Sequence, residues 1–106
     1  MPKYLFVAKY LGSGIKGLLN EGGTARRAAV EKAAQSVGGS VESFYYAFGE
    51  SDAYIVSELP DNEAAAGFAV TVNASGAASV STTVLLTPEE MDRAVKKVPS
   101  YRAPGQ

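Results

Sequence analysis

The stretch from Val41 to Leu59 constrains the fold of this chain more than any other, because it places two strand-like segments around one turn. Aromatic and β-branched residues dominate both segments, and these residue types suit a pleated sheet. The joint between them reads Gly49-Glu50-Ser51-Asp52, a composition typical of a turn. The stretch therefore predicts a β-hairpin that forms the central strand pair of a sheet.

The remaining elements follow from the spacing of apolar residues. Alternation over residues 3–10 and 77–86 predicts two further strands, and apolar residues spaced three and four apart predict helices over 24–37 and 62–75. The order β-α-β-β-α-β predicts a ferredoxin-like α+β domain with an antiparallel four-stranded sheet. We expect one domain over residues 1–98, since 106 residues supply one core.

Short signals mark the ends of the helices. Thr24 is the expected N-cap of the first main helix, and residues 59–62 are expected to form a loop and cap before the second. Thr87-Pro88-Glu89-Glu90 has the pattern of a capping box, which predicts a C-terminal helix that ends by Pro99. Residues 99–106 are expected to form an extended tail.

Composition removes several functional classes. Ten Lys and Arg against eleven Asp and Glu leave no basic surface for nucleic acid. The chain has no Cys and no His, which excludes thiol nucleophiles, disulfides, Cys/His zinc sites and imidazole bases. We therefore expect no metal and no cofactor. The sequence lacks an apolar run of membrane-spanning length and a signal-peptide core, so a cytoplasmic location without membrane contact is expected.

The predicted sheet has more apolar surface than two helices can cover. The clearest case is the strand before the turn, where large side chains fall on both faces: Phe44, Tyr46 and Phe48 against Val41, Tyr45 and Ala47. An exposed apolar face of that size is typical of a partner surface. We therefore predict a homodimer, possibly a higher oligomer, with two sheets packed face to face and Tyr46 at a partner-facing position.

Four segments of the chain resemble the GYD-domain proteins. They are Y-L-F-V-A-K-Y (4–10), E-G-G-T-A-R-R-A-A-V-E-K-A (21–33), S-V-G-G-S-V-E-S-F-Y-Y-A-F-G-E-S-D-A-Y-I-V (36–56) and L-P-D-N-E-A-A-A (59–66). The resemblance implies a small bacterial protein of the dimeric α/β-barrel superfamily. Its Gly-x-Tyr-Asp signature is Gly49-Glu50-Ser51-Asp52 here, so a serine replaces the family tyrosine. The resemblance leaves the function open, because relatives in the superfamily range from oxygenases and isomerases to ligand sensors.

One motif matches a cofactor fingerprint without its context. Residues 12–17 read G-S-G-I-K-G, which fits G-x-G-x-x-G after a strand. The acidic residue that this fingerprint needs about 20 positions later would fall near Val37, where no carboxylate lies. We interpret the motif as a glycine-rich end of the first strand.

The first turn of the helix over 24–37 is the most favourable place for an anion. Two glycines, free backbone N–H groups and two guanidinium groups meet there. Arg26 precedes Val30 by four residues and so shares its sheet-facing stripe, whereas Arg27 is spaced to pair with Glu31 on the surface. The alternative is a structural salt bridge from Arg26 to Asp52 or Glu50. The candidate ligand-binding residues are Lys9, Arg26, Tyr46 and Asp52, with a turn role as the alternative for Asp52.

Three functions remain open. The first is a ligand-binding or sensor module whose dimer encloses a cavity between the sheets for a small apolar or weakly anionic metabolite. The second is a cofactor-independent monooxygenase or isomerase that uses Tyr and Arg, although the sequence shows no obvious base. The third is an assembly protein without a ligand.

Overall fold

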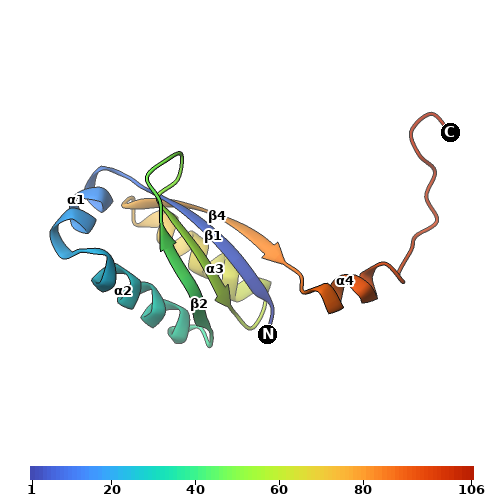
Figure 1. Cartoon of the computed structure of the whole chain (residues 1–106), viewed down its shortest axis with the longest axis horizontal. Coiled ribbons are helices and arrows are strands. Elements are labelled where there is room, and N and C mark those ends of the chain that lie inside the picture. Colours follow the sequence, from blue (N-terminus) through green and yellow to red (C-terminus); the bar gives the residue numbers. More distant parts are fainter.

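The computed structural model describes residues 1–106 and contains one four-stranded antiparallel sheet with four helices. The elements are, in order, β1 (Lys3–Tyr10), α1 (Gly12–Glu21), α2 (Gly23–Ser36), β2 (Ser40–Tyr46), β3 (Ala53–Glu58), α3 (Asn62–Ala74), β4 (Ala78–Leu85) and α4 (Pro88–Ala94). The strand order is β2-β3-β1-β4 (Figure 1). This arrangement confirms the ferredoxin-like α+β fold and the β2-β3 hairpin. The prediction that the hairpin is the central strand pair is wrong, because β2 lies at an edge of the sheet and the central pair is β3 with β1.

The core lies between one face of the sheet and the two main helices. Alternate residues of β1 (Tyr4, Phe6 and Ala8) point to that face and are buried, because β1 pairs with β3 on one side and with β4 on the other. The Phe6 ring contacts Phe68 of α3 with 5.0 Å between ring centroids. The buried Tyr4 hydroxyl donates a hydrogen bond to Asn62 Oδ1 at 2.7 Å, which ties the start of α3 to the central strand.

The two main helices begin differently. Asp61 caps α3 by accepting a hydrogen bond from the Ala64 backbone N–H at 2.9 Å, as expected for this loop. The expected Thr24 cap is wrong: α2 begins at Gly23, and its N-cap is Gly22, which makes no side-chain hydrogen bond. Gly22 has a φ of 85°, a left-handed conformation that glycine adopts without strain.

Because β2 contains a β-bulge, its side chains are distributed over the two faces of the sheet differently from what the sequence predicts. Val41 pairs with Ser57 whereas Ser43 pairs with Val56, so the alternation reverses around Glu42. Val41, Phe44 and Tyr46 consequently all lie on the helix side. The prediction that Tyr46 faces a partner is therefore wrong, and the expected strand position of Phe48 is wrong too, because this residue is fully exposed in the loop after β2.

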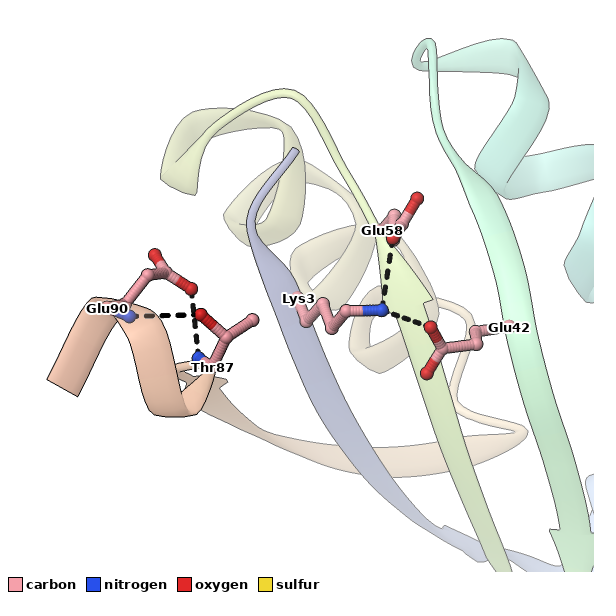
Figure 2. A network of polar contacts seen from close by, with 5 residues as sticks. All are labelled: Lys3, Glu42, Glu58, Thr87 and Glu90. Atoms are coloured by element: carbon pink, nitrogen blue, oxygen red, sulfur yellow. Dashed lines mark hydrogen bonds and ion pairs between the residues drawn. The ribbon is translucent and has the colours of Figure 1, made fainter. Parts of the chain in front are cut away.

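No helix covers the opposite face of the sheet, which we call the open face (Figure 1). Leu5, Val7 and Val56 lie on it and are only partly buried, and Tyr45 is 72% exposed. At one end of this face Lys3 pairs with Glu42 and, at 3.1 Å, with Glu58, so that three strands are bridged (Figure 2). These two carboxylates raise the pKa of Lys3 above its ordinary value.

The C-terminal helix lies apart from this body, beyond the end of β4 (Figure 1). Its predicted capping box is confirmed: Thr87 Oγ1 accepts from the Glu90 N–H at 3.1 Å and Glu90 Oε1 accepts from the Thr87 N–H at 2.9 Å (Figure 2). The helix ends at Ala94, earlier than the expected stop at Pro99, and none of its side chains is buried. None of the helices combines the length and apolar character needed to cross a bilayer.

Candidate functional site

A cavity of about 390 Å³ opens on the helix side of the sheet, where β1 ends and β4 begins. We call it the Arg26 cavity. Strand β1 and helices α1, α2 and α3 all contribute side chains to it. The polar lining residues are Tyr10, Ser13, Glu21, Arg26, Thr71 and Ser75.

An apolar crevice lies beside this cavity, between the sheet and the two main helices. It measures about 60 Å³, and Phe6, Val30 and Phe68 are among its apolar lining residues. Tyr10 and Arg26 line both spaces, so the crevice adjoins the cavity at these residues. The cavity thus carries the Arg26–Glu21 ion pair among polar residues and the adjoining crevice is apolar, a distribution expected of a small-molecule site.

Arg26 reaches this position because it shares the sheet-facing stripe of α2 with Val30, as its spacing predicts. Its Nη1 lies 3.3 Å from Glu21 Oε1 at the end of α1, so the salt bridge expected with Asp52 or Glu50 has a different partner. Both side chains of the pair are more than a third exposed. A pair of this kind contributes only about 0–1 kcal/mol to stability.

Asp52 forms hydrogen bonds with the backbone of the neighbouring strand β1. Its Oδ2 accepts a hydrogen bond from the Tyr10 N–H, and its own N–H donates to the Ala8 carbonyl, both at 2.8 Å. These bonds fasten the hairpin loop to the end of β1 and fix the backbone that carries Tyr10 into the cavity. The contacts favour the turn interpretation of Asp52 over direct ligand contact.

Tyr46 lies beside the first turn of α2. Its hydroxyl donates to the Gly23 carbonyl at 2.9 Å, and its ring occupies the space that a Cβ at position 23 would need. Burial raises the pKa of Tyr46 to about 12, and the nearby Tyr10 phenol adds to the rise, although Arg26 and Arg27 oppose it. Tyr46 therefore remains a neutral donor and cannot serve as a base near neutral pH.

Arg27 lies on the other side of the same helix turn. It borders a separate hollow of about 230 Å³ with Phe44 and Tyr46, and its Nε lies 4.0 Å from Glu31 Oε1. The expected surface pair of Arg27 with Glu31 is thus confirmed.

Lys9 lies on the open face, away from the Arg26 cavity. Its Nζ donates to the Glu50 carbonyl at 3.3 Å, and with Ser51, Ser79 and Ser81 it borders a shallow hollow of about 340 Å³. The four candidate residues therefore do not form one site. Arg26 and Tyr46 meet at the start of α2, Asp52 supports the strand behind them, and Lys9 faces the other way.

Sequence reasoning missed the contribution of α1. The glycine-rich motif that was interpreted as the end of a strand forms this helix, and a Cβ at Gly14 would lie 1.8 Å from the Ala77 carbonyl oxygen. Gly14 thus lets α1 approach the start of β4. Gly17 lines the cavity with nothing within 4 Å of its missing Cβ, so it leaves space open. Glu21 follows one turn later.

One antiparallel sheet with helices on a single face and a cavity at its end defines a ferredoxin-like α+β domain. A comparison with protein-family profiles matches the GYD domain over residues 4–95. The chain belongs to the GYD-domain family, as the resemblance indicated. Searches of curated proteins and of solved structures found no match.

Proposed function

We propose that this GYD-domain protein is a homodimeric module that binds a small, apolar, weakly anionic metabolite in the Arg26 cavity. The observation that carries the proposal is the guanidinium of Arg26 at the mouth of a cavity that adjoins an apolar crevice. The cavity volume of about 390 Å³ falls within the range of ordinary ligand sites.

The chemistry of the lining defines the ligand class. The acidic group of the ligand, a carboxylate or phenolate, replaces Glu21 as the partner of Arg26. Because the Arg26–Glu21 pair is exposed, breaking it costs little free energy. Tyr10, Thr71 and Ser75 line the same mouth, where the hydroxyls of Thr71 and Ser75 donate to the backbone carbonyls of Gly67 and Val72. The apolar part of the ligand lies in the cavity with one edge against the crevice between Val30 and Phe68, which at about 60 Å³ is too small for a whole ring.

The homodimer is supported by the open face of the sheet. Leu5, Val7 and Val56 form an apolar strip there that no element of the same chain covers. A second copy covers this strip, and the two-fold axis of a homodimer makes the cover reciprocal. The hollow beside Lys9 lies on this same face of the sheet.

One observation favours a second candidate function, a cofactor-independent enzyme of the isomerase or monooxygenase kind. Glu21 places a carboxylate, and hence a possible base, in the same cavity as Arg26 and Tyr10. In that case Arg26 and the Tyr10 phenol stabilise an enolate or phenolate that Glu21 forms from the substrate.

Calorimetric titration with 2-naphthoate, an aromatic carboxylate, tests the binding proposal. We expect one molecule bound per chain and much weaker binding of the neutral 2-naphthalenemethanol. Arg26→Ala should weaken 2-naphthoate binding at least about tenfold, equivalent to about 1.4 kcal/mol, while the melting temperature changes little because the Glu21 pair is exposed. Equal affinity of the variant and the wild type for 2-naphthoate would refute the site.

A further inference from the structure

Residues 86–106 form an arm that packs little against the rest of its own chain. Its apolar stripe is exposed, with Met91 at 49%, Val95 at 62% and Val98 at 77%. The radius of gyration of the chain is 16.7 Å, whereas a folded chain of this length has about 13 Å. The arm therefore extends from the body with apolar side chains that solvent surrounds.

The exposed area of the chain is too large for a monomer. The chain exposes 7206 Å², whereas a folded monomer of 11.0 kDa exposes about 5,600 Å². The excess of about 1,600 Å² is roughly twice what one partner buries in an interface of standard size. A single further copy can cover it.

The charge of the arm indicates where it docks. The first half of the arm holds three acids, Glu89, Glu90 and Asp92, whereas from residue 93 onward it holds four cationic side chains and no Asp or Glu: Arg93, Lys96, Lys97 and Arg102. Residues 1–86 carry eight Asp and Glu against six Lys and Arg, and two of the acids, Glu42 and Glu58, share the single cation Lys3.

That acidic pair borders an apolar patch at one end of the open face. Leu5, Val56 and Leu85 lie on adjacent strands there, because Leu5 pairs with Val56 and Lys3 pairs with Leu85. All three are only partly buried. We call these residues, with Glu42 and Glu58, the acidic patch. An apolar centre with a negative rim complements an apolar stripe that carries cations.

We propose that the arm of each chain packs on the acidic patch of a second copy. In the single chain the arm leaves the sheet at the end of β4, and the capping box of Thr87 and Glu90 with Pro88 fixes the start of α4 there (Figures 1 and 2). The inference rests on the proposed homodimer and adds a second contact to it. Because the dimer has a two-fold axis, each chain buries the arm of the other in the same way.

Sedimentation equilibrium of single variants tests this inference. Val95→Asp puts a charge on the arm, and Val70→Asp puts the same charge on an equally exposed valine of α3. We expect Val95→Asp to raise the dimer dissociation constant at least about tenfold and Val70→Asp to leave it unchanged, because only the first is buried in the dimer. Unchanged dimerisation of Val95→Asp overturns the arm contact and leaves the dimer standing, whereas a monomeric wild type overturns both.

Chemical cross-linking locates the contact. The chain contains no Cys, so engineered thiols react only with one another. A chain with Val98→Cys mixed with a chain carrying Ser43→Cys, which lies next to Glu42, should form a mixed cross-linked dimer with a short bis-maleimide. Val70→Cys in place of Ser43→Cys is the control. Equal yields for the two pairs would contradict docking on the acidic patch.

Discussion

At the scale of single residues, Arg26 is held in place by its helix and held loosely by its ion partner. The spacing of four residues from Val30 aims its side chain at the sheet, and Glu21 meets its guanidinium across 3.3 Å at the cavity mouth. Binding and folding therefore depend on different contacts of the same side chain. This separation makes Arg26 and Glu21 informative sites for substitution.

Glu21→Gln distinguishes the binding module from the enzyme. If the protein only binds its ligand, the variant should bind 2-naphthoate several-fold more tightly, because Arg26 loses the carboxylate that competes with the ligand. Calorimetric titration measures this affinity. Turnover of quinol or polyphenol substrates by the wild type that disappears in Glu21→Gln would favour the enzyme instead.

Tyr46 should contribute to alkaline unfolding. Its pKa is raised from 10.0 to about 12 in the folded protein, so the unfolded chain loses this proton first as the pH rises. The contribution is complete below pH 10.0 and is lost between pH 10.0 and about 12. Urea denaturation of the wild type should show a falling free energy of unfolding in this range.

Tyr46→Phe provides the comparison for that range. The variant keeps the ring but loses the hydroxyl that donates to Gly23, so its stability is lower by a constant amount at neutral pH. Its fall above pH 10.0 should be shallower, although the raised pKa values of Lys3 and Tyr4 act in both proteins. Parallel curves for the two proteins would show that the phenol does not titrate as described.

The sequence predicted single residues well where neighbours in the chain decide their contacts. The capping box of Thr87 and the pair of Arg27 with Glu31 are set by local spacing, and both were correct. The partner of Arg26 was not predictable, because the approach of α1 to α2 depends on the unusual φ of Gly22. The sequence shows a glycine there but not the direction in which the chain turns.

At the scale of elements, the glycines of α1 shape the cavity. Gly14 permits close contact with the start of β4, and Gly17 leaves space in front of Arg26. The role of α1 in the site was not predicted from the sequence, since a missing side chain leaves no pattern. A cavity that exists because glycines have no side chain can be recognised only in the folded structure.

Gly17→Leu should close the cavity without harming the fold. The new side chain meets no atom within 4 Å at its Cβ, and leucine favours a helix over glycine by roughly 0.5–1 kcal/mol. We expect stability to be kept or raised and 2-naphthoate binding to be lost, as measured by thermal denaturation and calorimetric titration.

Gly67→Leu is the matched control for this substitution. Gly67 lies inside α3, has nothing within 4 Å of its missing Cβ and is outside the cavity. This variant should gain helix stability and bind 2-naphthoate as the wild type does. Retained binding in Gly17→Leu would move the ligand out of the Arg26 cavity.

The bulge in β2 explains why the alternation of residues assigned some side chains of this strand to the wrong face of the sheet. Strict alternation assigns Val41 and Phe44 to opposite sides, but one extra residue at Glu42 brings both to the helix side. The bulge also turns the Glu42 carboxylate toward Lys3 (Figure 2). The order and type of the elements were predictable from periodicity, whereas an inserted residue that shifts the register was not.

At the scale of the whole molecule, the chain has two uncovered apolar features. The open face carries Leu5, Val7 and Val56, and the arm carries Met91 and Val95. The sequence indicated the first by the shortage of helices, and the extended arm became evident only from the fold (Figure 1). In the proposed homodimer, one identical chain supplies the cover for both.

Sedimentation equilibrium of the wild-type protein tests most directly the claim that one chain is half of the functional unit. The account predicts a particle of about twice the chain mass of 11.0 kDa across the working concentration range. A single species of 11.0 kDa at all concentrations would contradict it.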